Sequence, residues 1–188
     1  MVGKAVREGA CEICILAGGR SQRMGRDKSR LRLGGRTMLG LIRREARSLG
    51  WPVRVIRRDV VRRCGPVGGI YTALKSTRAE AVLFLACDMP FVTVEVMRSV
   101  VGKGGRAAFM RSEGGAGFPF VLPRTALAVV AEQIKRREFS LQALARVLKA
   151  KIARAPRALA WRLSNFNTPE EWEEARSRLS LVKVGSIG

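Results

Sequence analysis

A glycine-rich segment with several basic residues, LAGGRSQRMGRDK at 16–28, follows a short apolar run. Glycines directly after a strand let backbone N–H groups approach phosphate oxygens closely, so Gly18 and Gly19 are candidate phosphate contacts. Arg23 and Lys28 add positive charge to the same segment. It is neither a P-loop, which needs glycine directly before the lysine, nor the dinucleotide fingerprint G-x-G-x-x-G. The segment therefore predicts a phosphate-binding loop of another kind.

A lone carboxylate stands just beyond a second apolar run, AVLFLA at 81–86. Asp88 follows this run in the sequence Cys87-Asp88-Met89-Pro90. Such an aspartate can start a turn or cap a helix, and it can also hold Mg²⁺ against a substrate phosphate. Open α/β sheets bind ligands at the carboxyl ends of their strands. A phosphate loop and a carboxylate at neighbouring strand ends together predict a nucleotide site with Mg²⁺ at Asp88.

Alternating strands and helices position these two segments. This alternation predicts an α/β fold, with a mostly parallel sheet flanked by helices on both faces, and the length of 188 residues favours one domain. Thr93, Ser140 and Thr168 are good helix N-caps, and Thr168 is followed by Pro169 at the first helical position. The expected strands are 12–17, 53–56, 81–86, 107–110 and 118–122. The expected helices are 39–49, 70–75 after a Gly-Pro segment at 65–69, 94–101, 125–135, 140–149 and 169–179.

The net charge of +21 is extreme, and it indicates anionic partners: nucleic acid, a membrane surface or phosphorylated small molecules. A basic nucleic-acid-binding protein is one interpretation, but one Tyr and three Trp offer few rings for base stacking. No apolar run approaches the roughly 18–20 residues of a membrane helix, and the start of the chain lacks the pattern of a secretion signal. We therefore expect a cytoplasmic protein that does not bind membranes.

Two of the four cysteines form a C-x-x-C pair, Cys11 and Cys14. A zinc site would need further ligands, and the chain has no histidine and no second C-x-x-C. Residues three apart in a strand point to opposite faces of the sheet. We interpret the pair as small buried side chains rather than as a metal or redox site. The lack of histidine also excludes Ser–His and Cys–His nucleophile systems.

Four segments in order resemble the molybdenum cofactor guanylyltransferases, which attach GMP to molybdopterin. The resemblance spans nearly the whole chain, and it implies a single-domain Rossmann-like nucleotidyltransferase fold over residues 11–180, with a loose leader at 1–10 and a tail at 181–188. The matching segments are LAGGRSQRMGRDK at 16–28, Asp59 followed by GPVGGIYTAL at 65–74, CDMPF at 87–91 and NFNTPEEW at 165–172.

The resemblance implies a role for each matching residue. Lys28 binds the triphosphate and stabilises charge on the α-phosphate, Asp59 helps to hold the guanosine, and Asp88 binds Mg²⁺. Asn167, with Asn165, faces the same site from the far end of the chain and is a second candidate metal ligand. The implied nucleotide-binding residues are Leu16, Ala17, Gly18, Gly19, Arg23, Lys28, Asp59, Gly65 and Asp88.

The implied reaction is attack of the molybdopterin phosphate on the α-phosphorus of GTP, with release of pyrophosphate. The product would pass to a molybdoenzyme or to its chaperone. The chain departs from the family between its first helix and the Gly-Pro segment, because residues 50–64 are too few for the extra strand and short helix usual there. Part of the guanine-side wall is therefore expected to be missing. A related transferase using CTP or another phosphorylated acceptor stays open.

Overall fold

The computed structural model describes residues 11–17, 32–33, 35–61, 63–101, 106–112, 115–164, 171, 173–174 and 177. Within them, six strands form one sheet, and two short strands, β2 (Arg32–Leu33) and β3 (Arg36–Thr37), form a separate antiparallel pair. The six strands, in sheet order, are β4 (Val53–Ile56), β1 (Cys11–Leu16), β5 (Ala81–Ala86), β7 (Gly115–Pro123), β6 (Ala108–Ser112) and β8 (Lys151–Ala153).

Five of the six sheet strands run in one direction. β1 is parallel to both β4 and β5, and β6 is parallel to β8. β7 alone is reversed, since it pairs antiparallel with β5 on one side and with β6 on the other. The predicted mostly parallel sheet is confirmed, and the carboxyl ends of five strands lie along one edge. We call this the carboxyl edge, and the opposite one the amino edge.

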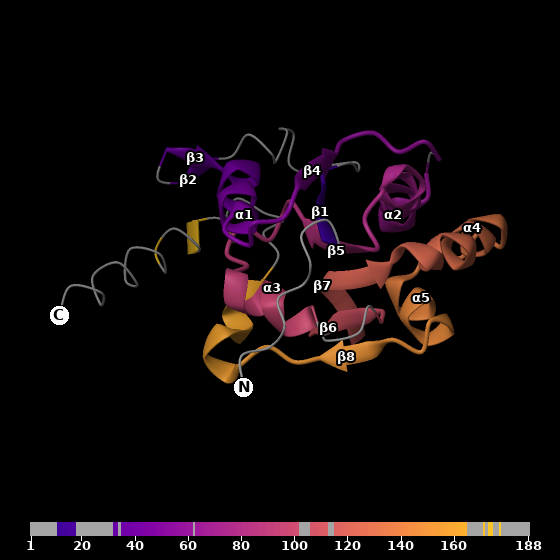
Figure 1. Cartoon of the computed structure of the whole chain (residues 1–188). Coiled ribbons are helices and arrows are strands. Elements are labelled where there is room, and N and C mark those ends of the chain that lie inside the picture. The colour runs from indigo at the N-terminus through magenta and orange to yellow at the C-terminus, as the bar shows by residue number, and fades with distance from the viewer. Residues whose placement is uncertain are drawn as a thin grey trace.

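Helices cover both faces of the sheet, as predicted (Figure 1). The helices α1 (Met38–Arg47) and α3 (Val94–Val100) bury residues such as Ile42 and Met97 against one face. The other face is covered by α2 (Gly65–Ser76), α4 (Leu127–Lys135) and α5 (Leu141–Val147). Alternate residues of a strand point to opposite faces, so the two cores share the same strands.

Side-chain caps fix the starts of three helices. The hydroxyl of Thr37 accepts from the Gly40 N–H at 3.0 Å at the start of α1. The predicted caps Thr93 and Ser140 are confirmed at the starts of α3 and α5. The predicted Thr168 cap lies outside the described residues. The prediction omitted β2, β3, β8 and the 3₁₀ segment η4 (Arg157–Leu163). It also placed the Gly-Pro segment 65–69 before the second helix, whereas α2 begins at Gly65, because proline is well suited to the first turn of a helix.

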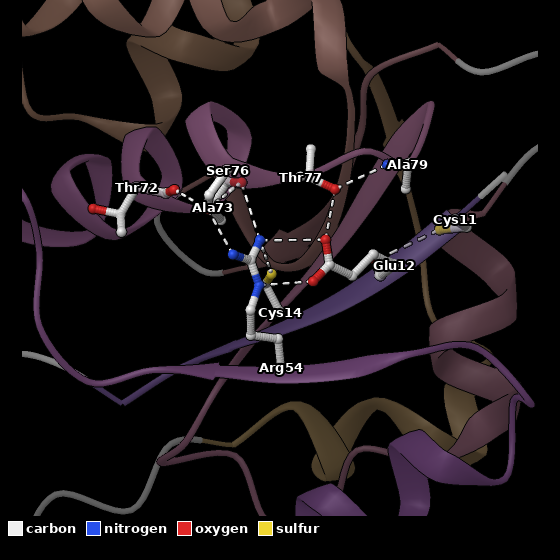
Figure 2. A network of polar contacts seen from close by, with 9 residues as sticks. All are labelled: Cys11, Glu12, Cys14, Arg54, Thr72, Ala73, Ser76, Thr77 and Ala79. Carbon is white, nitrogen blue, oxygen red and sulfur yellow. Dashed lines mark hydrogen bonds and ion pairs between the residues drawn. The ribbon is translucent and has the colours of Figure 1, made fainter. Parts of the chain in front are cut away.

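A polar network closes the amino edge of the sheet (Figure 2). Arg54 of β4 forms an ion pair with Glu12 of β1, with 2.7 Å between Nε and Oε1. The same guanidinium donates to the hydroxyl of Ser76 at 2.6 Å and to the carbonyl of Ala73 at 3.1 Å, both near the end of α2. Thr77 donates its hydroxyl to Glu12 at 2.5 Å. The network thus ties two neighbouring strands to the helix that packs on them.

The network leads to a test of stability. Arg54→Ala should lower the free energy of unfolding by about 2 kcal/mol, because it leaves the Glu12 carboxylate, only 15% exposed, without its countercharge. The matched control is Arg136→Ala. Arg136 pairs with Glu132 on the surface, with side chains 72% and 50% exposed, so its loss should change the free energy by less than about 0.5 kcal/mol. Urea unfolding measures both; equal effects would contradict a structural role for the network.

Candidate nucleotide-binding site

The carboxyl ends of β4, β1 and β5 are joined by backbone hydrogen bonds beyond the strands themselves. Ala17 donates its N–H to the carbonyl of Ile56 at 2.8 Å, and Cys87 donates its N–H to the carbonyl of Leu16 at 3.2 Å. The chain leaving β1 is therefore held between the chains leaving its two neighbours. Segments far apart in the sequence meet at this edge, where the predicted nucleotide contacts Leu16 and Ala17 lie.

Asp59 reaches the same edge from the loop after β4. Its carboxylate lies against the first turns of α2, at two glycines that leave room for it. A Cβ added at Gly69 would stand 3.1 Å from Cδ2 of Leu16 and 3.3 Å from Oδ1 of Asp59. One added at Gly68 would stand 2.9 Å from the carbonyl oxygen of Val61. The glycines thus allow α2 to pack closely against Leu16 and Asp59.

The Asp59 carboxylate has a perturbed electrostatic environment. Burial raises the pKa of the Asp59 carboxyl above its ordinary value. Burial, and next the negative charge of Asp59, raise the pKa of the nearby Cys64 thiol. None of the ion pairs between described residues involves Asp59. The carboxylate is partly desolvated without an ion-pair partner in the described chain, which is typical of a group placed for a ligand.

Asp88 lies in the turn that follows β5. The turn is anchored by buried Met89, Phe91 and Val92, and Asp88 itself is half-buried. Phe91 packs against Trp161 of η4, with 5.7 Å between the ring centroids, so the chain beyond β8 returns to the Asp88 turn. This contact brings the segment that precedes Asn165 and Asn167 toward the site, although those two residues lie outside the described ones.

A single protein carboxylate, that of Asp88, is suited to hold a Mg²⁺ ion that binds together with a nucleotide. No group of three or more His, Cys, Asp or Glu side chains that could cage a metal occurs among the described residues. Mg²⁺ is commonly held by one or two carboxylates, several waters and substrate phosphates rather than by a cage of protein ligands. The hard oxygen donors of Asp88, at the edge where phosphates are expected, fit that kind of site.

The structure brings five of the predicted site residues to one edge of the sheet. Asp59 and Gly65 come from the loop and first turn between β4 and α2, where Gly65 has a φ of 53°. Gly69 was not predicted as a site residue, although its place in the GPVGG run was a signal. The five are Leu16, Ala17, Asp59, Gly65 and Asp88. The predicted residues Gly18, Gly19, Arg23, Lys28 and Asn167 lie outside the described residues.

The C-x-x-C cysteines lie elsewhere and on opposite faces, as the strand geometry predicts. Cys11 packs in the core under α1 and α3, and Cys14 in the core under α2, α4 and α5. Burial raises the pKa of the Cys11 thiol to about 11 and that of Cys14 to about 12. Both therefore stay protonated at neutral pH, whereas the thiolate is the metal ligand and the nucleophile.

Together, a mostly parallel sheet, a glycine-lined helix start and two carboxylates at the carboxyl edge define an α/β nucleotide-binding domain. The chain belongs to the family with a MobA-like NTP transferase domain, whose family model matches residues 13–155. The predicted family resemblance is thereby confirmed.

Individual relatives agree with this assignment. A probable molybdenum cofactor guanylyltransferase of Opitutus terrae is 33% identical, covering 87% of this chain and 94% of its own. A crystal structure of molybdopterin-guanine dinucleotide biosynthesis protein A from Archaeoglobus fulgidus matches with a TM-score of 0.67 at 18% identity, over 90% of this chain and 98% of that one. A Mycobacterium tuberculosis protein in complex with manganese matches with a TM-score of 0.51 at 19% identity, over 79% and 88%. No helix among the described residues is long and apolar enough to cross a membrane.

Substitution of Asp59 tests whether its carboxylate has a functional or a structural role. Asp59→Asn should not lower the melting temperature at pH 7, because the raised pKa means that folding disfavours the charge that this change removes. Any gain should vanish at acid pH, where both side chains are neutral. Glu12→Gln is the control, because it removes the negative charge that is ion-paired with Arg54. It should lower the melting temperature by roughly 2–4 °C, since about 1 kcal/mol of stability is lost. A similar loss for Asp59→Asn would make that carboxylate structural.

Proposed function

We propose that this protein transfers GMP from GTP to molybdopterin, forming the guanine dinucleotide cofactor and pyrophosphate. The supporting observation is the position of Asp59 and Asp88 on either side of the β1 end, within a chain 33% identical to a probable molybdenum cofactor guanylyltransferase. Asp59, beside Leu16 and the α2 glycines, would hold the guanosine. Asp88, after β5, would face the phosphates.

The chemistry needs positioning and charge neutralisation more than a protein nucleophile. An oxygen of the molybdopterin phosphate attacks the α-phosphorus of GTP, forming a new P–O bond. The bond from the α-phosphorus to the bridging oxygen breaks, and that oxygen leaves with pyrophosphate. Lys28 would stabilise negative charge on the α-phosphate, and Gly18, Gly19 and Arg23 would bind the triphosphate.

A divalent metal would be held by Asp88, with Asn167 as a second ligand, and when bound would neutralise phosphate charge. We propose Mg²⁺; the manganese in the Mycobacterium tuberculosis structure supports a divalent metal for that protein. We place the reaction in the cytoplasm, and the dinucleotide would pass to a molybdoenzyme or its chaperone. The high positive charge suits anionic substrates.

Turnover with GTP, Mg²⁺ and molybdopterin tests this function, with the dinucleotide and pyrophosphate both measured. Asp88→Asn should keep the melting temperature and lower kcat/KM by about a hundredfold, because one charge on the metal is lost. Glu95→Gln, which removes an exposed carboxylate on nearby α3, is the control and should keep full activity. Near-normal turnover of Asp88→Asn at saturating Mg²⁺ would remove Asp88 from the metal site.

The choice of base is a separate question, raised by the short connection before α2. β4 forms an edge of the sheet, and the chain passes from it through residues 57–64 straight into α2. Among the described residues no further strand lies outside β4. A guanine site discriminates through polar groups that the wrong base leaves unpaired, and a shortened wall offers fewer of them.

We therefore expect GTP to bind with only about tenfold preference over ATP and CTP, or 1.4 kcal/mol, the value of one modest hydrogen bond. Calorimetric titration of the three nucleotides with Mg²⁺, at one salt concentration, measures this preference. A thousandfold preference for GTP would show that the short connection still builds a complete guanine wall. Tighter binding of CTP would favour the cytidylyl-transferring alternative.

A further inference from the structure

Two arginines meet at the carboxyl edge, on the half of the sheet that the nucleotide residues do not occupy. β6 and β8 are parallel neighbours in which Met110 is paired with Ala153. The next residues in the chain are Arg111, which is still in β6, and Arg154, which directly follows β8, and both are exposed. Paired residues of adjacent strands lie about 4.8 Å apart and on the same face. The register therefore places the backbone of Arg154 beside that of Arg111, one residue beyond the last pair of the two strands.

No acidic side chain compensates this pair within the described chain. The ion pairs there are Arg54–Glu12, Lys135–Glu132 and Arg136–Glu132, and the side-chain hydrogen bonds likewise leave Arg111 and Arg154 unused. Like charges opposite each other on neighbouring strands are destabilising, and we expect the same of two arginines one residue beyond the last pair. An anion between them would reverse this cost, and two guanidinium forks are well shaped to bind oxyanions in bidentate fashion.

The sheet order sets the position of the pair relative to Asp88. β7 connects the two halves of the sheet, since Phe84 of β5 is paired with Phe120 and Met110 of β6 with Gly117. Counting along the strands places Met110 next to the row in which β1 and β5 end. Two strand spacings separate β5 from β6, which is about 10 Å. Asp59 lies at the other end of that row, beyond β1. The backbone of the pair is thus about 10 Å or more from that of the Asp88 turn, on the side opposite the guanosine half.

We propose that Arg111 and Arg154 bind the acceptor, at an anionic group about 10 Å from its reacting phosphate. This inference rests on the proposed function and specifies its second substrate site. A transferase with two substrates must align both along one edge, with the α-phosphorus between them. In molybdopterin the anionic dithiolene, together with the metal–oxygen group that it carries, lies between the phosphate arm and the neutral pterin, so it is the anionic group that the two arginines would bind.

The test compares two pairs of substitutions, each of which removes two exposed positive charges. The double variant Arg111→Ala/Arg154→Ala should raise KM for molybdopterin about tenfold, while the Kd of Mg²⁺-GTP stays within twofold of the original. The control, Arg146→Ala/Lys151→Ala, changes exposed residues of α5 and β8 toward the amino edge and should alter neither value. Without ligands, the first variant should melt no lower than the original protein, because a repulsion is removed.

Each outcome has a distinct meaning. An unchanged KM for molybdopterin in the first variant, with normal product, overturns this inference and leaves the proposed function standing. An equal rise in both double variants, or an equal loss of GTP affinity, shows a general effect of charge and also overturns it. Absence of product from the original protein, with GTP bound, overturns the proposed function and this inference with it. Molybdopterin with and without its metal identifies whether the dithiolene or the metal–oxygen group is bound.

Discussion

The parallel alignment of β4, β1 and β5 is the constraint on which the site depends. Each of these strands ends at the same edge, and two backbone hydrogen bonds, from Ala17 to Ile56 and from Cys87 to Leu16, hold the departing chains together. Asp59 and Asp88 lie in different loops that are far apart in the sequence. They come to one edge only because their strands are neighbours of β1 and run in its direction. A shift in this pairing would separate the two carboxylates.

The two edges of the sheet use polar groups in opposite ways. At the amino edge, Glu12 and Arg54 are paired with each other and with the end of α2, so the charges there are neutralised within the protein. At the carboxyl edge, Asp59 has a raised pKa without an ion-pair partner among described residues. Stability is concentrated where charges are satisfied, and binding capacity where they are not, as is usual when function competes with stability.

Much of this arrangement could be predicted from the sequence because the apolar runs are clear. The runs at 81–86 and 53–56 are strands with the predicted bounds, and the run at 12–17 is shifted by one residue in β1 (Cys11–Leu16). The reversal of β7 was not predicted, since a buried antiparallel strand has the same apolar character as a parallel one. β8 has only three residues, two of them exposed, so its pattern is too weak to show.

The sequence could predict which types of residue form the candidate site, but not which of them contact one another. The approach of α2 to Leu16 and Asp59 depends on Gly69, whose importance appears only when the helix is packed on the sheet. Likewise, Arg111 and Arg154 are unremarkable in a chain with 36 Lys and Arg. Their adjacency results from the pairing of β6 with β8, a strand that the sequence did not reveal.

The distribution of charge connects these features to function. With 36 basic and 15 acidic residues, most basic side chains cannot have an acidic partner anywhere in the chain. An overall positive field draws anions to the surface without choosing among them, and it weakens as salt increases. Choice requires cations held at fixed positions, which strands provide better than mobile surface loops do. In the proposed site, Arg111 of β6 and Arg154 directly after β8 would therefore convert a general attraction into an ordered alignment of two anionic substrates.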